Sequence, residues 1–454
     1  MKKTKKVTAV LMAAIMAFGL TACGSKEAPA EPADKETTAS EEVQEVKQEP
    51  EKTEQASGEK EVLEFYHGYW HDEATWYPAV VMREIYQEFA DAHADGDVVF
   101  TPIPVEDLAP IYTNKIAAGS FPDMIDLAGT SLPGAAVAQG LVYDIKPYVD
   151  KEGIQEQLGL NYTQNTIDGK LYTVHDQLLT LGMWANTDVL KATGAALPDK
   201  WDTWDAFAEA METVRANGEA EGFYSYGSGQ GSVRMFNTAL AATSAGAAML
   251  DSELTPEIIT SSEFEEAFKI IANMDQKNGS ANSAVNANDF SADFNEGKSA
   301  VFVNGVWAAG GFAGNAAFEP TVYPGNVALS SAGGGITISN GLSEAQTQLA
   351  LEFIKYMTSE EVQTRIFLEV QANPCNPSLD LEALAASGDG SAALLAKACS
   401  LCNKAGTIVK TVDAAWGSDI ATAIQNKLTE CSVSGADIDA IFSTLKDELI
   451  AIIG

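Results

Sequence analysis

A tryptophan that follows a predicted strand is the residue best suited to bind a solute by stacking. Residues 294–307 run from a helix end, through a Gly-Lys turn, into an apolar segment that ends at Asn304-Gly305 just before Trp307. In open α/β sheets, ligands bind beyond the carboxyl ends of the strands. A tryptophan there offers a large rigid face and one N–H donor, which suit the C–H side of a sugar ring. We therefore count Trp307 and Asn304 as candidate ligand-binding residues, with packing in a core as the alternative for Trp307.

Further candidates follow strands predicted in the first part of the chain. His67 and Trp70 follow residues 62–66, an expected first strand. The imidazole of His67 could donate or accept a hydrogen bond to a hydroxyl group. Asp126 lies within the third predicted strand, and Asp176 lies at a predicted crossover, where its carboxylate could accept two hydrogen bonds from adjacent sugar hydroxyls. The alternative is a surface loop for His67 and Trp70, and a hinge or a cap for Asp176.

Two tyrosines and a pair of histidines complete the set of candidates. Tyr224 and Tyr226 lie in a Gly/Ser-rich stretch, which is expected either to line the ligand site or to form a plain surface loop. His67 and His71 have a spacing that could suggest a metal site if both lay on a helix. We expect this segment to precede the helix, so we predict no metal ligands here.

The chain has five cysteines. One is Cys23, and the other four are Cys375, Cys399, Cys402 and Cys431. Cys399 and Cys402 form a C-x₂-C pair in an apparent helix. A second C-x₂-C is missing, so the pattern only weakly favours zinc. Outside the cytosol one or two disulfides are an open alternative, and the spacing does not define their partners.

The N-terminus has the features of a bacterial lipoprotein signal. Residues 1–6 are rich in lysine, residues 7–20 are apolar, and Leu20-Thr21-Ala22 precedes Cys23. This pattern is similar to a lipobox, in which the cysteine is lipidated and the bond before it is cut. Residues 23–60 contain no aromatic residue and are rich in Glu, Lys, Ala, Pro, Ser and Thr, so we expect a disordered acidic tether.

The composition excludes some classes of partner. The chain has 454 residues, 46% of them hydrophobic, and a formal charge of −36, as expected for an acidic globular protein of two or three domains. This negative charge argues against binding to nucleic acid, which depends on Lys/Arg–phosphate contacts. It also argues against adsorption to an anionic membrane surface, which repels an acidic protein. No phosphate-binding loop, Gly-x-Ser-x-Gly or His-Glu-x-x-His motif occurs.

The elements that must position the candidates alternate between strand and helix. Residues 62–66, 98–100 and 123–127 read as strands with helices between them, which predicts a mostly parallel sheet with covered faces. Capping pairs Ser262/Glu265, Ser343/Gln346 and Thr358/Glu361 predict three helix starts, the first of them for a helix over 262–279. The glycines of residues 331–335 predict a crossover between lobes.

In combination, several segments resemble one known family. They are residues 118–123, 168–172, 184–188, 203–204, 294–307 and 345–361. Their order and spacing are similar to those of the extracellular solute-binding lipoproteins of ABC importers, specifically the large carbohydrate-binding group (family 1). The resemblance implies a type II periplasmic-binding-protein-like α/β fold, in which helices flank mixed sheets and a ligand cleft separates two lobes. Lobe 1 would take residues 61–176 and 332–375, and lobe 2 residues 177–331 and 376–454.

The resemblance also implies a function. The protein would be a monomer anchored to the bacterial cell membrane through Cys23, without cofactor or catalysis, which captures a sugar or oligosaccharide and delivers it to the transmembrane subunits of an ABC permease. A peptide or polyamine in the same fold is one alternative. A surface carbohydrate-active enzyme is another, and would need two carboxylates about 5–10 Å apart. An adhesive surface lipoprotein is a third. One departure from the family pattern is Thr173-Val174-His175-Asp176, where the family often has Gly-x-Pro after the preceding tyrosine.

Overall fold

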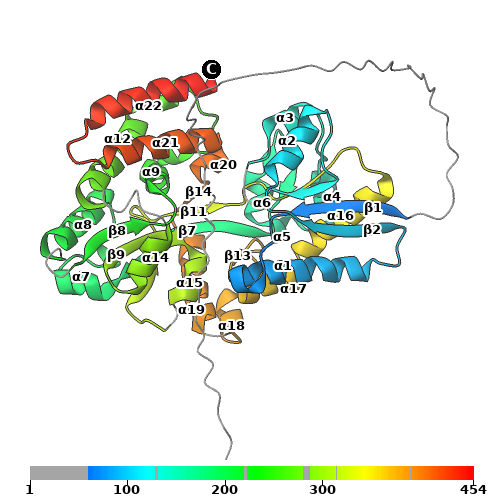
Figure 1. Ribbon diagram of the computed structural model, residues 1–454, viewed down its shortest axis with the longest axis horizontal. Helices are drawn as coiled ribbons and strands as arrows, with labels where there is room; N and C mark the ends of the chain where they lie inside the picture. Colours follow the sequence, from blue (N-terminus) through cyan, green and yellow to red (C-terminus); the bar gives the residue numbers. More distant parts are fainter. Residues whose placement is uncertain (1–59, 128–130, 219–221, 280–286, 313, 389) are drawn as a thin grey trace, which may run out of the picture. The chain divides into compact units, whose positions relative to one another are not determined.

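The computed structural model describes residues 60–127, 131–218, 222–279, 287–312, 314–388 and 390–454. The predicted signal peptide, Cys23 and residues 23–59 of the predicted tether lie outside the described residues. Two mixed sheets, one small two-stranded hairpin and the helices around them make up the described chain (Figure 1). Within that part of the chain, no helix has the length and apolar character needed to cross a membrane.

The first sheet has five strands in the order β2-β1-β3-β12-β6. β1 is parallel to β2 and β3, whereas β12 is antiparallel to both β3 and β6. The predicted strand–helix–strand start is therefore confirmed, and the predicted strand at 62–66 is β1. The strands are β1 Glu61–His67, β2 Val98–Pro104, β3 Met124–Asp126, β6 Thr173–Val174 and β12 Ile336–Ile338.

Helices from two parts of the sequence cover this sheet. Phe65 of β1, Phe89 of α1 and Phe353 of α16 pack together, with the ring centroid of Phe353 5.0 Å from each of the other two. Near this sheet lie α1 Glu73–Ala92, α2 Ala109–Ala117, α3 Gly134–Ala138, α4 Lys146–Glu152, α5 Gln155–Leu158, α6 Leu160–Gln164, the β4 Thr166–Ile167 and β5 Lys170–Leu171 hairpin, α16 Glu344–Met357, α17 Glu360–Arg365 and the π-helical turn η5 Ile366–Val370.

The second sheet is built around one long strand, β7 Gln177–Asn186. Its order is β14-β11-β7-β9-β8, and β10 and β13 also pair with β7. β9 is antiparallel to β7 and parallel to β8. The other strands are β8 Tyr224–Ser228, β9 Ser299–Gly305, β10 Phe318–Thr321, β11 Val327–Ser331, β13 Asn373–Pro374 and β14 Thr407–Val409.

Both faces of the second sheet are buried, because successive side chains of a strand point to opposite faces. Val301 and Val303 of β9 join one hydrophobic cluster, while Phe302 between them joins another. The helices around this sheet are α7 Thr187–Thr193, η1 Pro198–Lys200, α8 Trp204–Gly218, α9 Ser232–Ala241, α10 Ser244–Met249, α11 Pro256–Ile259, α12 Ser262–Met274, η3 Asp275–Gly279, α14 Ala287–Asn295, η4 Val306–Ala308, α15 Ala309–Phe312, α18 Leu381–Ala385, α19 Gly390–Asn403, α20 Val412–Trp416, α21 Ser418–Cys431 and α22 Ile438–Ile453.

Two of the three predicted capping pairs are shifted by one residue. The Ser343/Gln346 capping box of α16 is present as predicted. For α12 the N-cap is Ser261, whose hydroxyl accepts from the Phe264 amide, and for α17 it is Ser359, whose hydroxyl accepts from the Val362 amide. In both cases two adjacent residues carry a hydroxyl group, and the N-cap is the one whose backbone is extended. The helix predicted to end at Gly279 is α-helical to Met274 and π-helical beyond it.

The chain passes between the two sheets at three places. The first passage joins β6 to β7 at His175 and Asp176, and the second joins β11 to β12 at residues 332–335. The third surrounds β13, whose Pro374 pairs with Gln177 of β7. The predicted crossover at 331–335 is confirmed, because β11 and β12 belong to different sheets. The predicted lobe boundaries at 176, 332 and 375 fall in these three passages and stay a prediction.

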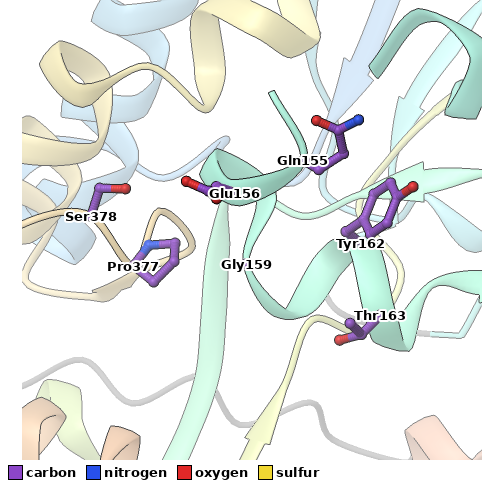
Figure 2. A pocket seen from close by; sticks show the side chains of 7 residues that line it. All are labelled: Gln155, Glu156, Gly159, Tyr162, Thr163, Pro377 and Ser378. Atoms are coloured by element: carbon purple, nitrogen blue, oxygen red, sulfur yellow. The ribbon is translucent and has the colours of Figure 1, made fainter. Parts of the chain in front are cut away.

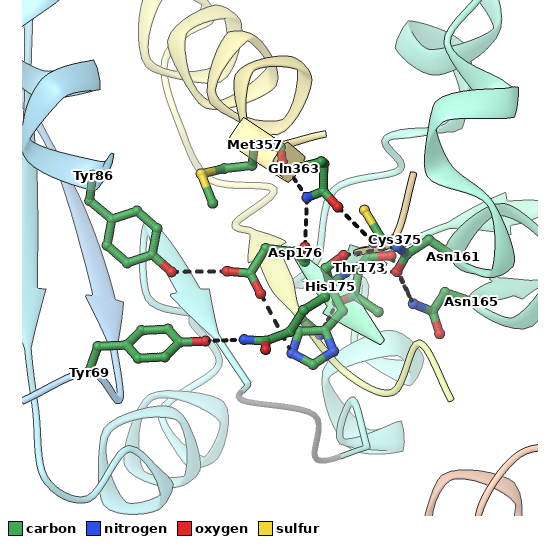
Figure 3. Close-up of polar contacts among 12 residues, drawn as sticks. Tyr69, Tyr86, Asn161, Asn165, Thr173, His175, Asp176, Met357, Gln363 and Cys375 are labelled. Atoms are coloured by element: carbon green, nitrogen blue, oxygen red, sulfur yellow. Dashed lines mark hydrogen bonds and ion pairs between the residues drawn. The ribbon is translucent and has the colours of Figure 1, made fainter. Parts of the chain in front are cut away.

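Side-chain amides from α6 and α17 hold all three passages. Figure 3 shows two of these residues, Asn161 and Gln363. Asn161 binds the backbone of His175 twice, accepting from its N–H at 2.8 Å and donating to its C=O at 2.9 Å. Gln164 donates to the carbonyl of Ser330 and accepts from the amide of Ala332, both at 2.9 Å. These two amides fix the first and second passages to the same short helix.

Gln363 joins the first passage to the third. Its side-chain nitrogen donates to the carbonyls of Asp176 and Met357, each at 2.7 Å. Its side-chain oxygen accepts from the amides of Cys375 at 2.7 Å and Asn376 at 3.3 Å. Gln363 is fully buried, so each of these bonds satisfies a group that water does not reach.

Candidate functional site

The carboxyl end of β9 brings together the two candidates from the second sheet. β9 ends at Gly305, and Trp307 follows in the short helix η4. Asn304 is 2% exposed, and its side-chain oxygen accepts from the Gly305 amide at 2.8 Å and from the Gln230 side chain at 3.3 Å. Gln230 follows β8, which is parallel to β9, so the two strands end at the same edge of the sheet. The predicted position of Trp307 beyond a strand end is therefore confirmed.

The indole ring of Trp307 folds back over the strand that precedes it. A β-carbon built on Gly305 would overlap the Cζ3, Cη2 and Cε3 atoms of that ring, so only glycine leaves room for it. Trp307 is half-buried and packs at the margin of a hydrophobic cluster. Among the described residues its indole N–H has no hydrogen-bond partner. The ring is thus fixed by packing, while part of its surface and its one donor remain available.

A charged pair at the same sheet edge was missed by the sequence reasoning. Arg234, in α9 just after β8, pairs with Asp413, in α20 just after β14. The Arg234 side chain is 14% exposed, and its Nε has no hydrogen-bond partner within the described part of the chain. The backbone carbonyl of Asp413 accepts from the Ser131 hydroxyl at 2.7 Å. Because Ser131 follows β3 of the first sheet, this bond joins the strand-end regions of the two sheets.

The structure does not bring Tyr224 and Tyr226 to this edge. β8 begins at Tyr224, which pairs with Ser299 at the opposite end of β9 from Gly305. Its hydroxyl donates to Asp293 at 3.1 Å. Tyr226 is 1% exposed and lies in a hydrophobic cluster. The Gly/Ser-rich stretch begins as a strand, so the residues near the site lie at its far end, at Gln230 and Arg234. The alternation of aromatic and small residues in Tyr224-Ser225-Tyr226 could have indicated that a strand begins here.

At the first sheet, His67 ends β1 as a neutral, buried side chain. It is 0% exposed, and its Nδ1 accepts from the Tyr69 amide at 3.3 Å. Burial lowers the pKa of His67 to about 3, and the nearby positive charge of Arg83 adds to this effect. Its Nε2 is buried without a hydrogen-bond partner among the described residues. This nitrogen is a donor for which a ligand or a water molecule could supply the acceptor.

The two candidate aspartates also lie at this edge, and both are fully buried. Asp126 ends β3, opposite Ile336 of β12. Asp176 accepts from the Tyr86 hydroxyl at 3.1 Å, and burial raises the pKa of Asp176. Burial lowers the pKa of His175, whose Nε2 lies 3.8 Å from the Asp176 carboxylate. The contacts of Asp176 are those of a residue that supports the passage between the sheets.

Trp70 is placed differently, because its side chain is 43% exposed. One face of its indole stacks on the His71 ring, with the ring centroids 4.0 Å apart and an interplanar angle of 27°. Both residues precede α1, which begins at Glu73, so the prediction that the histidine pair is not helical is confirmed. In the described part of the chain, no group of three or more His, Cys, Asp or Glu side chains is placed to hold a metal ion.

The four cysteines of the body are free and buried. Cys399 and Cys402 lie in α19 and belong to one hydrophobic cluster, Cys431 belongs to a second, and Cys375 to a third. Burial raises the pKa of all four thiols. The cysteines therefore act as small apolar side chains here, and the alternatives of a disulfide and of a Cys₄ zinc site both disagree with the structure.

Two hollows lie away from these strand ends. The first has a volume of about 420 Å³ and lies between α5, α6 and the third passage (Figure 2). It is lined by Gln155, Glu156, Gly159, Tyr162, Thr163, Pro377 and Ser378. The second, of about 830 Å³, lies between α8 and α12 and is lined mostly by charged side chains. Neither contains a predicted site residue.

Comparisons with known proteins agree with this architecture. A family model described as "Bacterial extracellular solute-binding protein" matches residues 84–390. A solute-binding protein of Streptococcus pneumoniae, solved in complex with the blood group A-trisaccharide, is 47% identical to this chain, with a TM-score of 0.79. That match covers 86% of this chain and 100% of the other. No match was found among curated proteins.

More distant structures share the fold. A chitin oligosaccharide binding protein is 18% identical with a TM-score of 0.67, and the match covers 86% of this chain and 100% of the other. An ABC substrate-binding protein from Listeria monocytogenes, solved in complex with cycloalternan, is 16% identical with a TM-score of 0.64. That match covers 87% of this chain and 100% of the other. The predicted type II two-lobed α/β fold with mixed sheets is confirmed by these neighbours.

Proposed function

Because the chain belongs to the family of bacterial extracellular solute-binding proteins, we propose that it captures a sugar or an oligosaccharide outside the cytoplasm. One observation carries this proposal: the relative with 47% identity, matched over its whole length, was solved with a trisaccharide. The peptide and polyamine alternatives lack comparable support.

The strand ends of the second sheet would supply the sugar-stacking surface. Trp307 is held over Gly305 with its indole N–H available, which suits one face and one hydroxyl of a sugar ring. Asn304, Gln230, Arg234 and Asp413 surround the same edge and add amide and charged groups that can bind hydroxyls. A site of this kind combines an apolar surface with a few placed polar groups, as small-molecule sites generally do.

The strand ends of the first sheet would supply the opposing groups. The buried Nε2 of His67 and the exposed indole of Trp70 follow β1 directly. We propose that the ligand lies in a cleft between the two predicted lobes and contacts both sets. Closure of the lobes on the ligand is then a shift toward the conformation in which both sets of contacts are made.

Delivery and anchoring complete the proposal. Lipidation of Cys23 would hold the protein at the membrane, and the acidic segment before residue 60 would let the folded body reach a permease. The unaltered protein should then incorporate a labelled fatty acid in its host, and a Cys23→Ser variant should not. Absence of label from the unaltered protein, or equal labelling of the variant, would contradict the predicted anchor and leave the sugar proposal untouched.

The binding proposal is tested by thermal unfolding of residues 61–454 with mono-, di- and trisaccharides, including the blood group A-trisaccharide. A ligand at about 100 times its dissociation constant stabilises the folded state by roughly 2.7 kcal/mol. We expect one class of sugar to raise the melting temperature, and we expect Trp307→Ala to abolish that rise. Peptides and polyamines serve as controls. A rise with these controls alone would overturn the sugar, and no rise with any compound would overturn the proposed function.

A further inference from the structure

A hydrogen bond outside the three passages joins the regions of the two sheets. The hydroxyl of Ser131 donates to the backbone carbonyl of Asp413 at 2.7 Å, across 282 positions of the sequence. Ser131 follows β3 of the first sheet and precedes α3, whereas Asp413 lies in the first turn of α20, after β14 of the second sheet. The two residues therefore belong to different predicted lobes, and any movement that separates β3 from α20 must break this bond.

The acceptor of this bond is fixed to the second sheet through α9. The Asp413 carboxylate pairs with Arg234 of α9, whose side chain is 14% exposed. The amide of Val412 donates at 2.7 Å to the side-chain oxygen of Asn237, a fully buried residue of the same helix. The start of α20 is thus tied to α9 at two points. A group held in this way loses little conformational freedom when it binds a partner.

The bond can also break without leaving a buried polar group unsatisfied. The Asp413 carbonyl accepts a second hydrogen bond, from the Gly417 amide at 3.0 Å, within its own helix. A carbonyl oxygen has two lone pairs, so the helical bond and the bond from Ser131 coexist. Ser131 is exposed, so water can take the place of its acceptor. The net contribution of such a bond is modest, which suits a contact that forms and breaks reversibly.

We propose that Ser131 and the Asp413 carbonyl form a reversible latch that holds the two predicted lobes together before a solute arrives. This inference rests on the proposed function and extends it to the closing step. The apparent dissociation constant of a solute is its intrinsic value divided by the fraction of the protein in the binding arrangement. The latch raises that fraction without touching the solute. It therefore strengthens the binding of every solute by the same factor and slows its release.

The test compares Ser131→Ala with unaltered residues 61–454 by small-angle X-ray scattering and by the kinetics of sugar release. Without sugar, the variant should have the larger radius of gyration, and a saturating sugar should remove the difference. Sugar should dissociate about 3- to 10-fold faster from the variant, by the same factor for each sugar that binds. Ser131→Thr keeps the hydroxyl and should match the unaltered protein. Ser387→Ala is the matched control, because that hydroxyl donates to the Leu384 carbonyl at 2.7 Å within one predicted lobe.

The possible results separate the latch from other roles of Ser131. Unchanged release together with an unchanged radius of gyration would overturn the latch. Faster release of one sugar alone, at an unchanged radius, would mean that Ser131 touches the solute and would also overturn it. Failure of the unaltered protein to bind any sugar would overturn the proposed function, while the scattering comparison without sugar would still test the latch. Melting temperatures without sugar, expected within a few degrees of each other, exclude misfolding as the cause.

Discussion

The indole ring of Trp307 occupies the space that a side chain on Gly305 would need. Gly305 has φ −72° and ψ 167°, an extended conformation that alanine also adopts. A methyl group at Gly305 would therefore be tolerated by the backbone and would displace the ring. The position of the tryptophan depends on a neighbour with no side chain.

The first prediction follows from that contact. Gly305→Ala should weaken sugar binding about as much as Trp307→Ala does, at least tenfold, while the melting temperature changes little because a half-buried ring can move aside. Titration calorimetry and thermal unfolding measure the two effects. Gly134→Ala, where a β-carbon meets no atom within 4 Å, is the control. Unchanged affinity in Gly305→Ala would show that the present ring position is not the one used for binding.

A second prediction concerns the close approach of two passages. A β-carbon on Gly335 would overlap the backbone of His175, which cannot move as a side chain can. Gly335→Ala should lower the free energy of unfolding by about 1–3 kcal/mol or more, measured by urea denaturation. Gly341→Ala is the control, since its nearest neighbour would be the Ser339 hydroxyl at 3.6 Å. Equal stability of the two variants would be inconsistent with the close contact.

The third prediction tests the amide that joins two passages. Gln363→Met should leave the carbonyl of Asp176 and the amide of Cys375 buried without partners, at roughly 1–3 kcal/mol for each group. The same substitution at the exposed Gln348 of α16 should cost far less, because it removes only one surface bond to Glu352. Denaturant midpoints of the two variants provide the comparison. Similar midpoints would mean that water replaces the lost bonds of Gln363.

A fourth prediction concerns pH. Burial raises the pKa of Asp275 from 3.8 to about 6, and its carboxylate accepts from the Tyr226 hydroxyl at 2.6 Å. Below pH 4 the group is protonated in the folded and unfolded states alike, so it has no effect on stability. Between pH 4 and 6 the Asp275 carboxyl is ionised in the unfolded state but still mostly protonated in the folded state. The free energy of unfolding therefore falls as the pH rises through this range, and the total loss above pH 6 is roughly 3 kcal/mol.

Replacing this carboxylate should remove that dependence. Asp275→Asn keeps an acceptor for Tyr226, so it should raise the melting temperature at pH 7 and leave it nearly unchanged at pH 4. Asp199→Asn, at a carboxylate 66% exposed, should have little effect at either pH. Thermal unfolding over the range pH 4–8 gives both comparisons. A lower melting temperature for Asp275→Asn at pH 7 would mean that the charged form is favoured in the fold.

Much of the fold could be predicted because its signals are local. The apolar run of β9 with its Asn-Gly end, the start of α1 after His71, and the glycines at residues 331–335 each report the conformation of their own segment. The Ser343/Gln346 capping box predicted the start of α16 for the same reason. Capping errors arose only where two hydroxyl residues are adjacent, because the choice between them depends on the backbone of the folded chain.

The rest of the site depends on contacts between distant segments, which spacing does not encode. Arg234 and Asp413 are 179 positions apart and meet only because β8 and β14 both end at one sheet edge. Gln363 likewise reaches Asp176 across 187 positions. Tyr226 was misplaced in the predicted loop because its glycine and serine neighbours obscured a short strand that its aromatic ring anchors in the core.

The burial of Cys375, Cys399, Cys402 and Cys431 makes the folded body a convenient sensor scaffold. A maleimide dye would react with one introduced surface cysteine and leave the four native thiols of the body untouched, since these are buried and their pKa values are raised. Ser378 is a suitable position, because it lines the hollow beside the third passage. A dye there would report movement of that passage as a change in fluorescence, so solute capture could be followed in real time without labelling the solute.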